Sequence, residues 1–239
     1  MVGRYRLVYC VDSLENKTPP IESCVTRARV CRAMDEKPTN SRQRIMDVAE
    51  ELILQHGFAA TSLKMIVEKA GLTKGSFFYH FDSKSDLAHQ LIERFAESDR
   101  QFLEMMMGRA ETVARKPRQQ LLVFIGLMLE EFGPQGQPPE GCLFASYSYE
   151  AALFDAEIHE ISRKFFLIWR RRLHDKLQEV AEEHPPRIDV DLQSLADMVS
   201  VTFEGGFVAA RILDDPEVLV AQLVHLRNYF ELLFDDGTT

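Results

Sequence analysis

The sequence predicts an all-α protein of about nine helices, and three observations lead to that fold class. Apolar residues recur at three- and four-residue spacing, breaks that contain Gly or Pro separate the periodic segments, and no stretch shows the alternation of a strand. Hydrophobic residues make up 46% of the 239 residues, which is enough for a substantial core. No apolar run approaches the about 18 residues that a membrane-spanning helix needs, so an integral membrane protein is excluded.

The first helices are expected in the segment from Asn40 to His80, because capping residues and glycine stops alternate there. Asn40 caps the first helix, with Gln43 completing a capping box, and Gly57 ends it. Either Thr61 or Ser62 caps a short second helix. Gly71 breaks the second helix, and Thr73 caps a very short third helix that ends near Phe81.

The remaining helices are longer, and Pro- or Gly-containing breaks separate most of them. Ser83, with Asp86 three residues later, predicts a capping box at the start of a helix that reaches about Met107. Further helices are expected at 117–132, 141–154, 156–184, 189–213 and 216–235.

Charge divides the chain into two parts of different character. Residues 1–86 hold 13 Lys and Arg against 11 Asp and Glu, whereas residues 87–239 hold 15 against 26. The net charge of −9 therefore resides in the second part, which would repel a polyanion. We interpret this as a division of labour between a domain at 40–86, which could approach a polyanion, and an acidic domain at 87–239; an extension at 1–39 precedes both.

The N-terminal segment and the cysteines indicate the cellular compartment of the protein. The four cysteines, Cys10, Cys24, Cys31 and Cys142, have neither a disulfide-framework nor a zinc-site spacing. The N-terminus also lacks the apolar centre of a signal peptide, so we expect a reduced, cytoplasmic protein. Residues 1–39 are expected to be a disordered extension, with Met34 as an alternative start of the native protein.

Residues 62–81 form a candidate helix-turn-helix, whose second helix can lie in the major groove of DNA. That helix begins with Lys74, Gly75 and Ser76, which supply a cation, a close backbone approach and a hydroxyl. Tyr79 and His80 can donate to phosphates. Short helix pairs joined by a glycine turn also occur in proteins without DNA function, so the pattern alone leaves both possibilities open.

Residues 41–90 resemble the DNA-binding domain of the TetR/AcrR family of bacterial repressors. The matching positions are Ile45, Ala49, Leu52, Gly57, Phe58, Thr61, Ser62, Ile66, the run AGLTKGSFFYHF from Ala70 to Phe81, Ser83, Lys84 and Leu87. The resemblance implies DNA contacts at Thr61, Ser62, Thr73, Lys74, Gly75, Ser76, Phe78, Tyr79, His80 and Lys84. Position 78 is often tyrosine in the family, and Phe78 offers an apolar contact in its place, such as one to a thymine methyl group.

The resemblance also implies a homodimer that binds a palindromic operator and is released by a small-molecule inducer. Two apolar stripes near the C-terminus are typical of a four-helix dimer interface, although the same stripes would also pack inside one protomer. The expected interface residues are Val199, Phe203, Gly206, Ala210, Leu219, Leu223, Leu226 and Phe230.

We expect the inducer to be apolar or aromatic, because the acidic domain is rich in Phe, Met and Tyr. The expected pocket residues are Phe102, Met106, Phe124, Met128, Cys142, Tyr147, Trp169 and Phe203. Cys142 begins a predicted helix, which favours a reactive thiolate and an electrophile- or redox-sensing repressor, whereas burial would make it inert.

No catalytic constellation, metal site or cofactor motif is recognisable, so an enzyme is not expected. The alternative to a regulator is a small-molecule-binding helical protein without DNA function.

Overall fold

The computed structural model describes residues 40–133 and 141–235. The predictions for residues 1–39, including the alternative start at Met34, lie outside this part of the chain. Within the described ranges the fold is all-α, with nine α-helices, one 3₁₀ helix and no strand, as predicted. None of the described helices combines the length and the apolar character that crossing a membrane requires.

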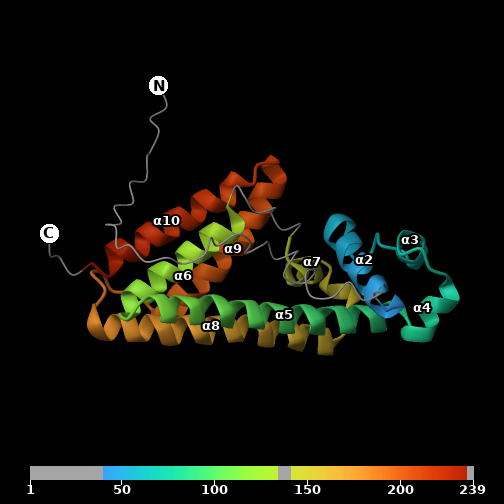
Figure 1. The fold of residues 1–239 in the computed structure, drawn as a ribbon, viewed down its shortest axis with the longest axis horizontal. Helices are drawn as coiled ribbons and strands as arrows, with labels where there is room; N and C mark the ends of the chain where they lie inside the picture. The colour runs from blue at the N-terminus through green and yellow to red at the C-terminus, as the bar shows by residue number, and fades with distance from the viewer. Residues whose placement is uncertain (1–39, 134–140, 236–239) are drawn as a thin grey trace, which may run out of the picture.

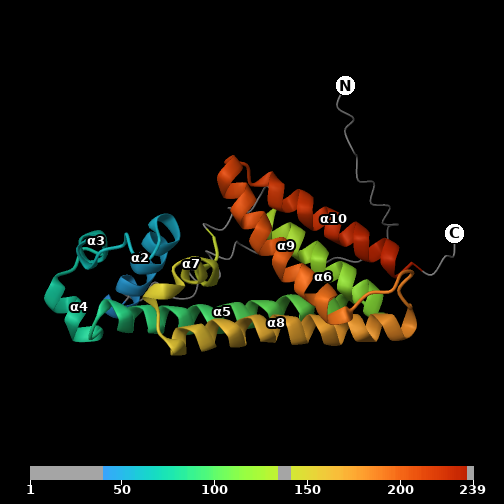
Figure 2. The same ribbon diagram turned by 180° about the vertical axis from the view of Figure 1, so that it is seen from behind.

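Figures 1 and 2 show the order and arrangement of these helices. They are α2 (Ser41–His56), α3 (Leu63–Lys69), α4 (Lys74–His80), α5 (Lys84–Val113), α6 (Pro117–Phe132), α7 (Leu143–Tyr149), η1 (Ala151–Leu153), α8 (Ala156–Glu183), α9 (Leu192–Leu213) and α10 (Glu217–Leu233).

The side-chain caps explain where the N-terminal helices begin. Asn40, Ser62, Thr73 and Ser83 each accept a hydrogen bond from a backbone N–H in the first turn of the helix that follows. The predicted capping box at Asn40 does not form, because the Gln43 side chain donates to Asp47 instead.

Several helix boundaries differ from the prediction; the helix expected at 189–213, for example, begins at Leu192. Helix α5 continues to Val113, six residues beyond Met107, since Met107 and Ala110 are still buried against neighbouring helices. The expected helix at 141–154 is interrupted at Glu150, whose backbone leaves the helical conformation and separates α7 from η1.

The long helices α5 and α8 lie side by side along the molecule, and the other helices pack on them (Figures 1 and 2). At one end, α2, α3 and α4 pack around the start of α5. At the other end, α6 and α9 pack on the long helices, and α10 packs on α6 and α9. With 30 residues, α5 is about 45 Å long and joins the two ends as one rigid element.

The described residues form two hydrophobic clusters. The first cluster surrounds Phe77 and Phe81 of the helix-turn-helix and also takes in Cys142, Leu143 and Tyr147 at or on α7. The second cluster lies among α5, α6, α8, α9 and α10. Phe165 and Phe207 pack against both clusters, so the two cores meet at these two rings.

Candidate DNA interface and candidate effector cavity

Helix α4 lies at the far end of the molecule, where its outer side faces solvent (Figures 1 and 2). Phe77 and Phe81 anchor it, because both rings are buried in the core beneath. In contrast, 84% of Tyr79 and 55% of Phe78 are exposed. Soluble proteins rarely expose two neighbouring aromatic rings, so this surface is available for a macromolecular contact.

The turn before α4 is built so that this helix projects outward. Gly71 has φ +63°, a conformation that favours glycine, and the Thr73 hydroxyl then accepts from the Ser76 N–H at 3.2 Å. A Cβ on Gly75 would meet only Thr73 Oγ1 at 3.7 Å, an ordinary contact. Packing within the chain therefore does not require glycine at position 75. A glycine there would allow a ligand to approach the backbone closely.

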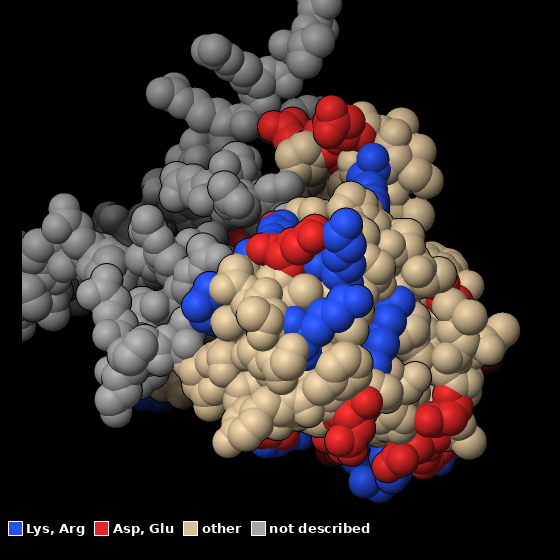
Figure 3. All heavy atoms as spheres, turned by 90° about the vertical axis from the view of Figure 1, so that its right-hand side faces the viewer, with Lys and Arg blue, Asp and Glu red and all other residues tan. Residues whose placement is uncertain are grey.

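Lys and Arg gather at the centre of this end face with an acidic group beside them, and further Asp and Glu lie toward its edges (Figure 3). Lys64 and Lys69 form ion pairs with Glu68 and Glu51, at 3.7 Å and 2.7 Å. Lys74 is exposed and forms no ion pair with the described residues. It is therefore available to a phosphate or a base edge.

The residues expected to contact DNA differ in exposure. Ser62, Thr73, Lys74, Gly75, Phe78 and Tyr79 are exposed, and Ser76, His80 and Lys84 are half-buried. Thr61 is fully buried, and its hydroxyl donates to the Gly57 carbonyl oxygen at 2.8 Å. The prediction that the Thr61 side chain contacts DNA is therefore corrected: the side chain is buried and bonds to the loop before α3, so it does not face a duplex.

Lys84 and His80 also make contacts within the chain. The Lys84 ammonium donates to the Phe58 carbonyl oxygen and lies 4.0 Å from the centre of the Phe58 ring. Burial lowers the pKa of Lys84, and the nearby Glu150 carboxylate partly offsets this. His80 Nε2 and Ser41 Oγ are 2.6 Å apart. Both contacts fix the helix-turn-helix to its neighbours, whatever the side chains bind in addition.

A cavity of about 70 Å³ lies where the two hydrophobic clusters meet. Most of its wall is aromatic, and its polar groups come chiefly from α5, α9 and the start of α7. The lining residues are Phe95, Asp99, Phe102, Met128, Phe132, Gly141, Cys142, Phe165, Phe166, Trp169, Ser200, Phe203, Glu204 and Phe207.

Two carboxylates face this aromatic wall. Asp99 is buried and accepts a hydrogen bond from Trp169 Nε1 at 2.5 Å. Glu204 Oε2 is buried and has no hydrogen-bond partner among the described residues. Burial raises the pKa of Glu204, the negative charge of Asp99 raises it further, and the adjacent Cys142 thiol partly offsets this. The cavity thus places two carboxyl groups in apolar surroundings.

Cys142 is a neutral thiol in this environment. Burial raises its pKa well above the ordinary range, and the Glu204 carboxylate raises it further, while the backbone N–H groups at the start of α7 partly offset both. Of the two alternatives for Cys142, this environment supports the buried, inert cysteine, because desolvation outweighs the backbone groups at the helix start.

The structure places five of the expected pocket residues at this cavity: Phe102, Met128, Cys142, Trp169 and Phe203. Met106, Phe124 and Tyr147 are buried elsewhere, the last with its hydroxyl donating to the Ala88 carbonyl oxygen at 3.2 Å. Sequence reasoning missed Asp99 and Glu204. Asp99 lies three positions before Phe102 on α5, and Glu204 lies next to Phe203 on α9. An acidic residue within an apolar stripe of a helix is the signal by which the sequence could have indicated both.

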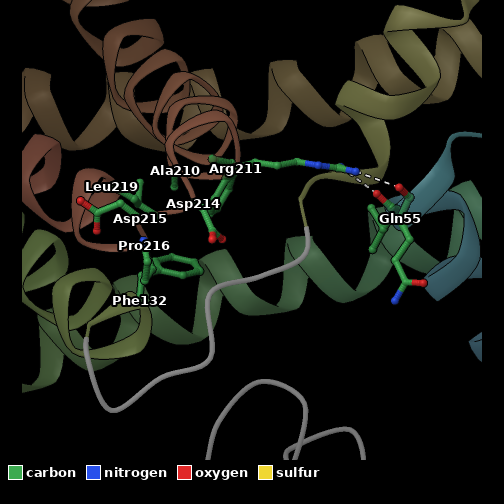
Figure 4. A pocket seen from close by; sticks show the side chains of 10 residues that line it. Gln55, Phe132, Ala210, Arg211, Asp214, Asp215, Pro216 and Leu219 are labelled. Carbon is green, nitrogen blue, oxygen red and sulfur yellow. Dashed lines mark hydrogen bonds between the residues drawn. The ribbon is translucent and has the colours of Figure 1, made fainter.

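A second, larger cavity of about 350 Å³ lies between α2, α9 and α10 (Figure 4). Arg211 extends from α9 along this cavity and donates to the carbonyl oxygens of Leu54 and Gln55, at 2.9 Å and 2.8 Å. The last carbonyls of a helix lack partners within the helix, so Arg211 caps the C-terminal end of α2 from another domain. Phe132 and Phe207 line both cavities.

The loop between α2 and α3 is held from α7 as well. Glu150, which follows α7, accepts from the backbone N–H groups of Phe58 and Ala59 at 2.7 Å and 2.8 Å. Because α7 begins at the cavity residue Cys142, this short helix links the cavity wall to the helix-turn-helix.

The expected dimer residues lie mainly inside the protomer. Val199, Phe203, Gly206, Leu219, Leu223, Leu226 and Phe230 are buried within one chain, and Ala210 lines the larger cavity. A Cβ on Gly206 would lie 2.5 Å from Leu219 Cδ1, so this glycine serves the contact between α9 and α10. The interface prediction is therefore corrected: the two stripes pack against each other within one protomer.

Two family models match the chain. The model described as bacterial regulatory proteins, tetR family, matches residues 45–91, and the model described as tetracyclin repressor-like, C-terminal domain, matches residues 119–226.

Curated relatives and solved structures agree with these matches. The transcriptional repressor DhaR of Mycobacterium sp. (strain GP1) is 24% identical over 76% of this chain and 87% of its own. The transcriptional repressor AcnR of Corynebacterium glutamicum is 34% identical over 35% of this chain and 47% of its own. The reduced form of NemR from E. coli has a TM-score of 0.64 with 23% identity, covering 79% of this chain and 95% of its own. The regulatory protein TetR from Rhodobacter sphaeroides has a TM-score of 0.65 with 20% identity, covering 79% of this chain and 98% of its own.

Proposed function

Because the chain belongs to the TetR/AcrR family of DNA-binding transcriptional regulators and is not an enzyme, we propose that it is a repressor controlled by a small-molecule inducer. In this proposal a homodimer binds a palindromic operator in the bacterial cytoplasm through α4. The inducer binds in the C-terminal domain and releases the DNA.

The observation that carries the proposal is the exposed surface of α4. Lys74, Gly75 and Tyr79 project from a helix whose inner side is fixed by buried Phe77. A helix anchored on one side and open on the other, at the end of an elongated molecule, suits insertion into a major groove. A helical protein without DNA function would have no need to keep this surface exposed.

A route for ligand control runs through two connections. Helix α5 joins Lys84 beside the helix-turn-helix to Asp99 and Phe102 at the aromatic cavity. Helix α7 and Glu150 join the cavity wall to the α2–α3 loop, as described above. A ligand that favours one arrangement of these elements shifts DNA affinity by the difference in its own affinity for the two arrangements.

The homodimer is proposed to form through the solvent-facing side of α9 and α10. Apolar side chains are exposed there, at Val201, Ile212, Leu213, Val224 and Leu232. Two copies joined on this side would each present an α4 to one DNA duplex. Sedimentation of the Val201→Glu variant tests this: a monomer is expected, and an unchanged dimer argues against this interface.

The DNA function is tested by selecting duplexes from a random library and titrating them with purified protein. We expect a palindromic site to be enriched, and Tyr79→Ala to weaken binding to all duplexes about equally. If Tyr79→Ala binds like the unmodified chain, or no site is enriched, the proposal fails.

A further inference from the structure

We propose that the aromatic cavity binds a small organic cation: a protonated amine that lies against Glu204 and Asp99, with its apolar arm packed on the surrounding rings. This inference rests on the proposed function, because it names the chemical class of the inducer. The sequence alone favoured an apolar or aromatic inducer with no charge specified.

One carboxylate oxygen at the cavity has no hydrogen-bond donor among the described residues. Glu204 Oε2 is buried at the cavity and lacks a hydrogen-bond donor among the described residues. A buried acceptor without a partner is unfavourable, so a ligand that donates to it gains affinity at this position. An anion or a pure hydrocarbon would leave the acceptor unsatisfied.

The second step concerns charge. None of the described residues that line the cavity is Lys, Arg or His, whereas two of them are carboxylic acids. The Asp99 charge disfavours ionisation of Glu204, and burial disfavours it more strongly. A bound cation offsets both effects through its attraction to the carboxylates, while a neutral alcohol supplies a donor without relieving the repulsion between the acids.

The aromatic lining of the cavity also favours a cation. Phe102, Trp169 and Phe203 belong to a lining made mostly of aromatic rings. The faces of aromatic rings attract cations, and cages of aromatic rings bind quaternary ammonium ligands in proteins. A volume of about 70 Å³ is small for a ligand site, so the proposal is limited to a compact ammonium group with a short arm and excludes a large planar ligand.

The chain carries a convenient reporter of this site. Trp169 is its single tryptophan, and it lies in the cavity wall with its Nε1 donating to Asp99. Its fluorescence therefore reports on this cavity alone.

The experiment compares two probes of the same size on the purified full chain. Benzylammonium and benzyl alcohol both carry a hydrogen-bond donor on a benzyl arm, but only the first is charged at pH 7. Fluorescence titration is expected to give an affinity for benzylammonium at least about tenfold higher than for benzyl alcohol. Equal affinities, or no binding of benzylammonium, would overturn the proposal.

Two variants locate the charge that is responsible. Glu204→Gln keeps the shape of the side chain and is expected to weaken benzylammonium binding by about tenfold while leaving benzyl alcohol binding unchanged. Glu182→Gln removes the same charge from an exposed position on α8 and is expected to alter neither affinity. If both glutamine variants behave alike, or if Glu204→Gln weakens both probes equally, the cation site is refuted.

The result is separable from the proposed function. Operator binding by the unliganded chain tests the DNA function without any probe. Intact operator binding with no preference for benzylammonium overturns the cation inference alone. A preference for benzylammonium in a chain that selects no DNA site overturns the repressor proposal instead.

Discussion

Glu204 and Arg211 lie seven residues apart on α9, about two helical turns, with Glu204 at the aromatic cavity and Arg211 on the last carbonyls of α2. One rigid helix therefore carries both the cavity's unmatched acceptor and a contact to the helix-turn-helix. In the proposed function, a movement of α9 in response to a ligand would act on the end of α2 through Arg211.

Replacing Arg211 by Ala is expected to lower the free energy of unfolding by about 1 kcal/mol, since two carbonyl oxygens of α2 lose their donor in a solvent-accessible setting. Urea denaturation measures this. Arg171→Ala, which removes an exposed arginine of α8, is the matched control and is expected to change stability by less than about 0.5 kcal/mol. Equal effects of the two variants would show that the Arg211 contact contributes nothing.

Replacing Lys74 by Ala is expected to reduce the preference for the selected site over a scrambled duplex by about tenfold, because in the proposed complex a side chain at the start of α4 contacts base edges. Fluorescence anisotropy with both duplexes at one salt concentration measures the ratio. Lys164→Ala removes an exposed lysine of α8 and leaves the ratio unchanged. An unchanged ratio for Lys74→Ala as well would exclude base reading by this residue.

Replacing Gly206 by Ala is expected to destabilise the fold by about 1 kcal/mol, because the added methyl group overlaps Leu219 Cδ1 and the buried Leu219 side chain has to shift from its packed position. Thermal unfolding at a fixed protein concentration measures it. At Gly108 a Cβ meets nothing within 4 Å, so Gly108→Ala in the interior of α5 is expected to stabilise by about 0.5–1 kcal/mol. Two changes of the same sign would contradict this packing argument.

Cys142 is expected to react slowly with iodoacetamide at pH 7, because its raised pKa leaves very little thiolate. The measurement uses a chain in which Cys10, Cys24 and Cys31 are replaced by Ser, so that Cys142 is the single thiol. Alkylation in urea provides the control, since unfolding returns the thiol to water and accelerates the reaction. Equally rapid alkylation of the folded chain would restore Cys142 as a candidate electrophile sensor.

The stability difference between Glu204→Gln and the unmodified chain is expected to depend on pH. Burial and Asp99 raise the pKa of Glu204 in the folded state, so ionisation destabilises the fold as pH rises from the unfolded-state pKa through the folded-state pKa. Below both values the carboxyl is neutral in either state, and the two proteins unfold alike. Above them the glutamine variant gains stability relative to glutamate. Denaturation across this pH range measures the difference, and a constant difference would contradict the assignment.

Local signals in the sequence were sufficient to predict most helix starts. Ser62, Thr73 and Ser83 cap helices as their side-chain chemistry predicts, because a cap acts within one turn of chain. The end of α5 was harder to predict. Its continuation to Val113 depends on burial against distant helices, which no local break signals.

Periodicity could not assign the buried stripes to a partner. Leu223 and Phe230 lie on an apolar face, but the pattern is the same whether that face meets a second chain or α9 of its own chain. The proximity of Asp99 to Glu204 could not be predicted from the sequence either. The two acids are 105 positions apart and reach the same cavity only when the chain folds. Exposure of Lys74 and Tyr79 followed from the motif, whereas burial of Thr61 did not.

The shared core of the helix-turn-helix and α7 has a consequence for the ancestry of such chains. Leu143 and Tyr147 complete the apolar interior beneath α2, although they lie beyond α6 in the polypeptide. A genetic crossover anywhere between α4 and α7 would combine the helix-turn-helix of one parent with the α7 core residues of another. New combinations of operator and effector are therefore expected to arise by point substitution on the two surfaces more readily than by exchange of gene segments.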